Sequence, residues 1–248
     1  MTRSEALREE TEELALALSA QHVTTVNAAE AERFQSIDGP TVSVLGHALP
    51  VAPTPATFQD RSHVLFLGNL AYDDSPNVDS YIWFVDEIMP YLGNVFEGQS
   101  RFFVAGRNDA ASVRERRNSK IDLLGPVADL EALFNKCRVF VAPTRYAAGI
   151  PHKVHQAASL GVPVVATSLL ARQLGWEDGR HLLVADTAEE FATAVSKLFE
   201  DADLWEAIRT AALQKVAQEC SPEAFRADLM RVISPGISLQ SINSLHAV

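Results

Sequence analysis

The sequence has little positive charge. Its 248 residues contain 21 Lys and Arg against 32 Asp and Glu, which gives a formal net charge of −11 with His neutral. A protein that binds the phosphate backbone of nucleic acid needs a basic surface to displace counterions. The composition therefore argues against a nucleic-acid partner, and any anionic ligand would have to be met at a local basic site.

Cysteine is also scarce, and histidine forms no recognisable metal motif. The two cysteines, Cys137 and Cys220, lie far apart and belong to no Cys-x-x-Cys pair, which argues against a disulfide framework and a zinc knuckle. His152 and His155 are three residues apart and could share a helical face, but no third ligand stands at a recognisable spacing. We expect no metal site.

Long apolar runs are absent as well. No segment approaches the roughly 18 residues of a membrane span, and the first residues, MTRSEALREETEEL, carry carboxylates where a signal peptide has an apolar core. We expect a soluble, cytoplasmic chain, with peripheral attachment to a membrane left open. Hydrophobic residues make up 47% and charged residues 21%, which is the balance of a globular protein with a substantial core.

Residues 1–49 predict a small αβαβ fragment. An N-terminal helix precedes a β-branched strand at 23–26, a second helix that opens at Asn27, and a strand at 41–45. These residues are too few to fill a sheet that is covered on both faces. Three prolines then mark a linker at 50–61.

From residue 62 to residue 234 the sequence alternates short apolar strands with amphipathic helices. This pattern predicts an α/β domain with a doubly wound parallel sheet of the Rossmann-like kind, followed by a loose tail at 235–248. Ligands of such sheets bind beyond the carboxyl ends of the strands, so the loops that follow the strands are the candidate sites. The predicted strands lie at 64–67, 101–105, 121–124, 139–142, 162–167 and 182–184, and the predicted helices at 77–92, 110–117, 129–135, 152–160, 187–200, 203–218 and 222–233.

The loop after the first strand of this domain lacks the glycine-rich motifs that bind dinucleotides or triphosphates. Gly68-Asn69-Leu70-Ala71-Tyr72 matches neither Gly-x-Gly-x-x-Gly nor a P-loop, so we expect no redox cofactor. Asn77 is a candidate cap for the next helix, whose backbone N–H groups could receive an anion. A glycine turn and an ordinary helix cap are an equally good interpretation.

Residues 139–167 are the most informative part of the sequence. They predict a buried strand, a turn at Gly149, a helix from about Pro151 that ends at Gly161, and another buried strand. Lys153 lies in the first helical turn, where a cation opposes the helix dipole unless it serves a bound anion. Gln156 follows on nearly the same face. Together they predict a phosphate site, with surface positions for both side chains as the alternative.

Residues 139–167 resemble the donor-binding half of the two-domain glycosyltransferases of the family-four type, which have the GT-B fold. That family has a strand ended by proline, then Glu-x7-Glu and Gly-x-Pro-Val-Val, and one branch carries Arg-Tyr-Gly-Ala-Gly-Ile-Lys in place of the first glutamate. Residues 145–153 are most similar to this branch. The resemblance covers about residues 22–234 and is supported by Gly68, Pro76-Asn77-Val78-Asp79, Trp83-Phe84, Gly106-Arg107-Asn108 and Gly125.

The resemblance implies donor-binding roles for individual residues. It assigns Lys153 to the donor diphosphate, with Arg107 as a second contact, and Gln156 to the ribose hydroxyls. Val127 would lie near the nucleobase. Surface charge and core packing are the plain alternatives for Arg107 and Val127. The rest of the implied donor site consists of Gly68, Asn69, Arg145, Gly149 and Ile150, and the last two would present backbone amides.

The sequence also departs from the family pattern. Ala148 stands at the first glutamate and Gln156 at the second, and a neutral amide loses about 1 kcal/mol of charge-assisted hydrogen bonding relative to a carboxylate. The family has an N-terminal acceptor-binding domain of similar size, of which only the last αβαβ piece, residues 1–49, is recognisable. Transfer requires donor and acceptor to be held together in a reactive geometry.

Three interpretations of function follow. The first is a group 1 glycosyltransferase, or its donor half, that moves a sugar from a nucleoside diphosphate to an acceptor, alone or with a partner subunit that supplies the acceptor half. The second is a non-catalytic nucleotide-binding or assembly module, with residues 1–45 as an oligomer interface. The third is a truncated enzyme. The sequence identifies no catalytic residue and leaves the base, sugar and acceptor open.

Overall fold

The computed structural model describes residues 3–36, 39–146 and 150–233. The chain divides into two compact units, of which the larger contains residues 49–218 and the smaller contains residues 1–48 and 219–248. The predicted turn at Gly149 and the predicted tail at 235–248 lie outside the described residues. The proline-rich segment at 50–61 falls within the larger unit.

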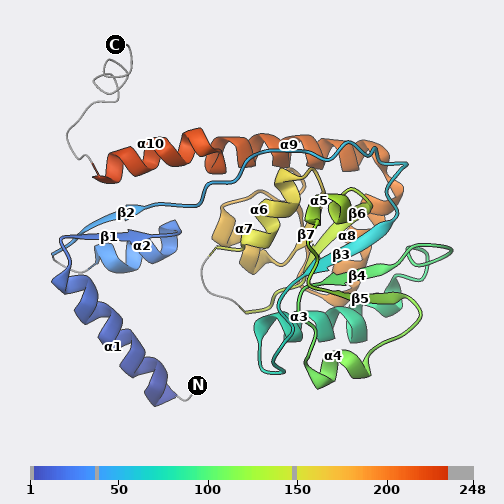
Figure 1. The fold of residues 1–248 in the computed structure, drawn as a ribbon, viewed down its shortest axis with the longest axis horizontal. Helices are drawn as coiled ribbons and strands as arrows, with labels where there is room; N and C mark the ends of the chain where they lie inside the picture. The colour runs from blue at the N-terminus through green and yellow to red at the C-terminus, as the bar shows by residue number, and fades with distance from the viewer. Residues whose placement is uncertain (1–2, 37–38, 147–149, 234–248) are drawn as a thin grey trace, which may run out of the picture. The chain divides into compact units, whose positions relative to one another are not determined.

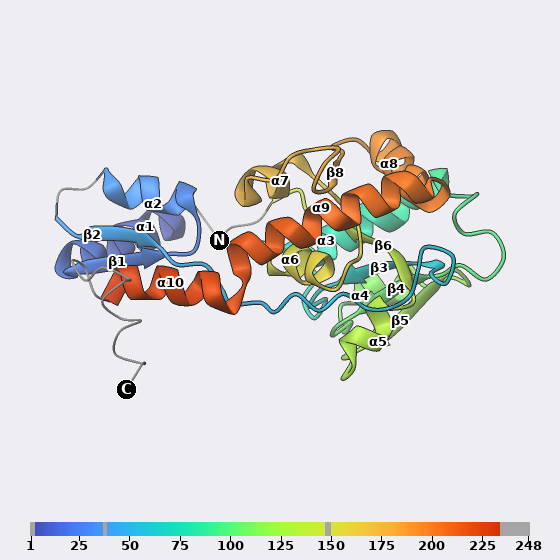
Figure 2. The same cartoon turned by 90° about the horizontal axis from the view of Figure 1, so that it is seen from above.

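The smaller unit contains a pair of parallel strands. Its elements are α1 (Arg3–Ser19), β1 (His22–Thr25), α2 (Ala28–Gln35), β2 (Thr41–Val44) and α10 (Pro222–Ile233). Helix α2 contacts both strands (Figure 2). The side-chain oxygen of Asn27 accepts a hydrogen bond from the backbone N–H of Glu30 at 2.9 Å, so Asn27 caps α2 as the sequence predicts.

The larger unit is built on a six-stranded sheet in which neighbouring strands are parallel (Figure 1). Its strands are β3 (His63–Leu67), β4 (Phe102–Ala105), β5 (Ile121–Gly125), β6 (Cys137–Ala142), β7 (Val164–Ala166) and β8 (Leu183–Val184). Its helical elements are α3 (Pro76–Trp83), η1 (Phe84–Ile88), η2 (Met89–Tyr91), α4 (Ala111–Glu115), α5 (Leu130–Phe134), α6 (His152–Ser159), α7 (Ser168–Leu174), α8 (Ala188–Glu200) and α9 (Ala202–Cys220).

The strand order β5-β4-β3-β6-β7-β8 makes the sheet doubly wound. From β3 the chain first adds strands toward β5, then crosses back and adds strands from β6 toward β8. Right-handed crossovers in opposite directions place their helices on opposite faces of a sheet. The order therefore reverses between β3 and β6, and the loops that leave these two strands diverge there to open a crevice. The predicted fold class is confirmed.

Apolar side chains fill both faces of the sheet because the strands are covered on both sides. Phe66 and Val141 belong to one large cluster with Tyr81 of α3 and Phe191 of α8. Phe140 alternates with Val141 and so faces the other way. It stacks on Phe134 of α5, with ring centroids 5.9 Å apart.

The helices differ from the sequence expectation in two places. The predicted helix at 77–92 begins one residue earlier, ends at Trp83 as an α-helix and continues as the π-helical turn η1 and the 3-10 turn η2, which contains Pro90. Helix α7 was not predicted, since no element was assigned between the strand at 162–167 and the strand at 182–184. It follows β7 after a single residue, Thr167. Among the described residues no helix is both long and apolar enough to cross a membrane.

Replacement of Gly106 by alanine will destabilise the larger unit. Gly106 follows β4 with φ +114, and an added Cβ would lie 2.0 Å from the backbone oxygen of Gly68, which follows β3. We expect the free energy of unfolding to fall by about 2 to 4 kcal/mol, measured by urea denaturation. Gly98→Ala is the matched control, since Gly98 has φ +63 and no neighbour within 4 Å, and it should cost only about 1 kcal/mol. Equal losses would contradict the close approach.

Candidate donor-binding site

A cavity lies beyond the carboxyl ends of β3 and β6, at the point where the strand order reverses. Its volume is about 490 Å³. Segments that are distant in sequence meet in it: the loop after β3, the start of α3, the loop after β6, the start of α6, and α7. We call it the switch-point cavity. Its lining residues are Leu67, Gly68, Pro76, Asn77, Thr144, Ile150, Pro151, His152, Lys153, Gln156, Leu170 and Gln173.

Lys153 brings a positive charge into this cavity. It lies in the first turn of α6, is partly buried, and its ammonium group donates a hydrogen bond to the side-chain oxygen of Asn77 at 3.0 Å. The same nitrogen lies 5.0 Å from the centroid of the Phe66 ring. Burial lowers the pKa of Lys153 to about 8, since removal from water disfavours the charged form. Within the described part of the chain, the ammonium is compensated by an amide oxygen and an aromatic face and not by a carboxylate.

Asn77 has a different role from the predicted one. The cap of α3 is Ser75, whose hydroxyl accepts a hydrogen bond from the backbone N–H of Val78 at 3.2 Å, and Pro76 occupies the first helical position. The prediction that Asn77 caps this helix was therefore wrong. Because Ser75 caps the helix, the Asn77 side chain is available to hold Lys153.

Gly68 has no room for a side chain. A Cβ at this position would lie 2.9 Å from the Phe66 ring and 3.0 Å from Cγ of Asn77, the two residues that contact Lys153. Asn69 is not among the lining residues, and its side-chain oxygen accepts a hydrogen bond from the backbone N–H of Ala71 at 3.2 Å. Glycine at position 68 therefore lets Phe66 and Asn77 approach the backbone at the end of β3.

Gln156 and Ile150, two of the residues predicted for the donor site, line the cavity, and other lining residues were not predicted. Gln156 lies about one turn beyond Lys153 on α6, and Ile150 precedes the helix. Thr144, buried at the end of β6, had no motif to reveal it. Gln173 could not be found, because the helix that carries it was not predicted.

Besides Asn69, three described residues of the predicted site lie outside the lining set. Arg145 forms a two-point ion pair with Asp79 of α3, at 3.0 and 2.5 Å, and this hydrogen bonding raises the pKa of Arg145 above its usual value. Arg107 is 58% exposed at its side chain and is paired with Asp109 at 2.8 Å. Val127 is partly buried beyond β5.

The lining favours an anionic ligand. Among the described lining residues there is no carboxylate, Lys153 supplies a cation, and the start of α6 presents the positive end of its dipole. A larger hollow of about 700 Å³ beside β8 and α8 has the opposite character, because Asp178, Asp186, Glu189 and Glu190 line it with Lys197. A diphosphate would be repelled there, so the switch-point cavity is the better anion site.

The chain belongs to the group 1 glycosyltransferase family. The sequence model of the family described as "Glycosyl transferases group 1" matches residues 61–201, more than half of the chain. This range contains every described residue of the switch-point cavity. The recognised resemblance is thereby confirmed. No curated protein sequence matches the chain significantly.

Solved structures with the same fold are similar to most of this chain. HepE from Anabaena, in complex with UDP and glucose, is 17% identical, with a TM-score of 0.72, over 90% of this chain and 66% of that chain. A variant of TarM from S. aureus, in complex with Fondaparinux, alpha-GlcNAc-glycerol and UDP, is 14% identical, with a TM-score of 0.75, over 92% and 46%. Sucrose-phosphate synthase from Thermosynechococcus elongatus is 14% identical, with a TM-score of 0.68, over 94% and 61%. The chain spans about half to two thirds of these structures.

Replacement of Lys153 by methionine will stabilise the chain at neutral pH. The pKa of Lys153 is about 8 in the folded chain and about 10.4 when unfolded, so burial of this group costs no stability above pH 10.4, and its cost grows as the pH falls toward 8. Methionine carries no such penalty and still packs on Phe66. We expect Lys153→Met to raise the free energy of unfolding by about 1 to 3 kcal/mol at pH 7.

Urea denaturation at pH 7 and pH 10 measures this effect. The gain in the free energy of unfolding of Lys153→Met over the parent chain should be smaller at pH 10 than at pH 7. Lys136, which is exposed and precedes β6, provides the control: the effect of Lys136→Met should not change between the two pH values. A Lys153→Met chain that is less stable than the parent at both pH values would show that burial of the ammonium does not destabilise the folded chain.

Proposed function

We propose that the chain is the donor-binding half of a glycosyltransferase and that the switch-point cavity holds a nucleoside-diphosphate sugar. The observation that carries this proposal is the Lys153 ammonium, desolvated at the start of α6 and held by Asn77 rather than by an acid. A charge that costs stability in the free protein is compensated when an anion binds it. Membership of the group 1 family supports the assignment of that anion as a diphosphate.

The proposed chemistry is the departure of a diphosphate. The bond between the anomeric carbon of the sugar and the diphosphate oxygen breaks, and the anomeric carbon becomes bonded to the oxygen of an acceptor hydroxyl, whose proton passes to the departing diphosphate. Negative charge grows on the diphosphate as it leaves, so Lys153 and the α6 dipole are placed where electrostatic stabilisation contributes most. No described residue of the cavity is assigned to take the acceptor proton.

The remaining donor contacts are proposed residue by residue. Gln156 accepts hydrogen bonds from the ribose hydroxyls, one turn beyond the diphosphate, and Ile150 offers its backbone amide. Gly149, which the resemblance also assigns to the donor site, lies outside the described residues. Arg107 joins the diphosphate after leaving Asp109, which costs little because the pair is exposed. Gly68 gives the diphosphate access to the backbone. Val127 stays a proposed nucleobase contact.

Asn69 and Arg145 have the least direct support as donor contacts. Asn69 is engaged in the turn after β3, and the guanidinium of Arg145 is held by Asp79. We assign both to the support of the site, where they hold the loops after β3 and β6 from outside the lining. Their replacement should therefore act through the geometry of those loops.

The acceptor half is proposed to come from elsewhere. The solved relatives are longer than this chain, and their alignments cover 46 to 66% of their lengths. An acceptor must be held against the donor for transfer. We propose a nucleoside-diphosphate sugar as ligand and an acceptor-binding half that is supplied by another polypeptide, by a second copy of this chain or by further sequence of a longer enzyme.

Calorimetric titration with UDP tests the donor site, because UDP is present in the structures of HepE and TarM. We expect UDP to bind and Lys153→Met to weaken it at least tenfold, which is about 1.4 kcal/mol. Lys136→Met, at the opposite end of β6, should leave the affinity unchanged. GDP, ADP and dTDP titrated in parallel identify the preferred base.

Two results would contradict the proposed donor site. If none of the four nucleotides binds the parent chain at millimolar concentration, the cavity is not a donor site. Equal affinities for Lys153→Met and the parent chain would remove Lys153 from the site and leave the family assignment standing.

A further inference from the structure

The C-terminal end of α6, opposite the cavity, is bound by a short segment that we call the strap, residues 52–56. The last carbonyls of a helix have no partner within the helix and need donors from elsewhere. Ala52 and Thr54 of the strap donate their backbone N–H groups to the carbonyls of Ser159 and Leu160, at 3.0 and 3.1 Å. The Thr54 hydroxyl also donates to Leu160, at 3.1 Å. The strap thus closes the end of α6.

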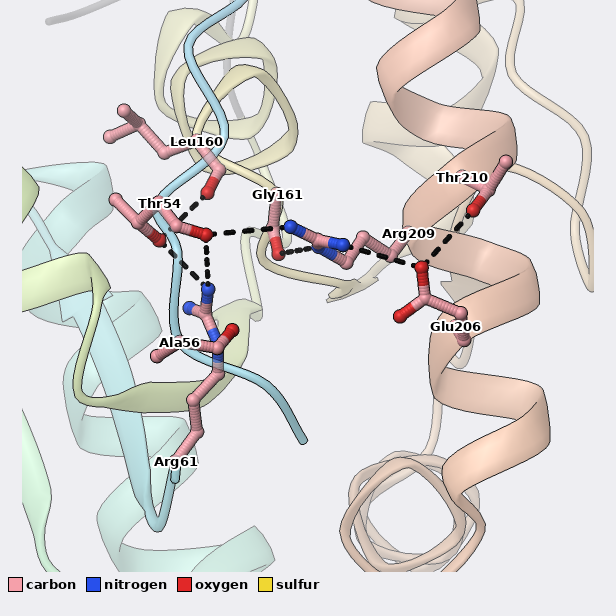
Figure 3. Close-up of polar contacts among 8 residues, drawn as sticks. All are labelled: Thr54, Ala56, Arg61, Leu160, Gly161, Glu206, Arg209 and Thr210. Carbon is pink, nitrogen blue, oxygen red and sulfur yellow. Dashed lines mark hydrogen bonds and ion pairs between the residues drawn. The ribbon is translucent and has the colours of Figure 1, made fainter. Parts of the chain in front are cut away.

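Arg209 of α9 binds the next carbonyl and the strap together (Figure 3). Its Nε donates to the carbonyl of Gly161 at 3.2 Å, and its Nη2 donates to the carbonyl of Thr54 at 3.4 Å. Glu206, one turn earlier on α9, pairs with its Nη1 at 3.3 Å. One planar guanidinium therefore joins α6, the strap and α9, and places a cation at the negative end of the α6 dipole.

Gly161 makes room for this contact. Its φ is +74, the left-handed conformation expected after a helix end. An added Cβ would lie 2.8 Å from Nε of Arg209 and 3.2 Å from Cβ of Pro53 in the strap. The position requires glycine for its backbone angle and for the approach of both neighbours.

Arg61 fastens the other side of the strap to the sheet. It is fully buried, and Figure 3 shows its guanidinium next to Thr54. Its nitrogens donate to the carbonyls of Ala56, Thr54, Phe134 and Cys137 and to the Thr54 hydroxyl. Phe134 ends α5 and Cys137 begins β6, so the strap cannot shift without disturbing the sheet.

We propose that Arg209 is a positioning residue that fixes α6, and thereby the Lys153 ammonium, in the switch-point cavity. Helix α6 has eight residues and is about 12 Å long, so its two ends move together as one short rod. Arg209 holds the end at Gly161, and Lys153 lies in the first turn of the other. The link to ligand binding rests on the proposed function.

The test measures the pKa of Lys153 by NMR of its side chain in the free chain, together with UDP affinity. In Arg209→Gln the end of α6 is released, water reaches Lys153, and its pKa should rise by about one unit toward the unfolded value. UDP affinity should fall about fivefold. Among the described lining residues His152 is the other titratable group, and it is assigned separately in the same spectra.

A second arginine separates positioning from general stability. Arg138 also donates to a backbone carbonyl, that of Phe199 at 2.8 Å, and stacks on Phe58, but it lies near the amino end of β6. Arg138→Gln should lower the melting temperature about as much as Arg209→Gln and leave the pKa of Lys153 unchanged. Arg209→Lys keeps the positive charge but lacks the planar guanidinium. The pKa of Lys153 in this variant should therefore lie between its values in the parent chain and in Arg209→Gln.

Equal losses of stability in both glutamine variants, with no change at Lys153, would make Arg209 a purely structural residue and overturn the proposal. If Arg209→Gln does not fold, Arg209→Lys gives the milder form of the test, because lysine keeps the charge but lacks the planar fork that reaches the carbonyls of Gly161 and Thr54 together. It should move the pKa of Lys153 upward by a smaller amount, and no change would overturn the proposal. The pKa is measured without nucleotide, so failure of UDP to bind counts against the donor site alone.

Discussion

The candidate site depends on one positive charge that is partly removed from water at the start of a helix. Lys153 opposes the α6 dipole and loses hydration, and it is retained by Asn77 and the face of Phe66. The doubly wound sheet makes this arrangement, since the reversal of strand order brings α3 and α6 to one crevice. Glycine at position 68 leaves the space between them.

Most of the fold could be predicted from the sequence because strand and helix periods alternate clearly in the larger unit. Helix α7 escaped because β7 is short and a single residue, Thr167, separates the two elements. The segment at 50–61 was expected to be a linker on the strength of its prolines. The structure shows its hydrogen bonds to α6, which join residues about 106 positions apart and leave no local signal.

Local rules found the centre of the candidate site and missed its partners. Lys153 and Gln156 were predicted because a lysine in the first turn of a helix, with a polar side chain on the same face, indicates an anion site without any information on distant residues. Arg145 looked equally available in the sequence, but its ion pair is with Asp79, 66 residues earlier. The capping residue of α3 was misplaced by two positions, and only the structure shows that Ser75 caps the helix while Asn77 binds Lys153.

The most direct measurement is the pKa of Lys153 in the presence and absence of UDP, read from the NMR signals of its side chain. The free chain should give about 8, and saturation with UDP should raise the value by at least about one unit, because a bound diphosphate favours the charged ammonium. Binding of UDP with no change in the pKa of Lys153 would contradict the claim that this ammonium meets the diphosphate.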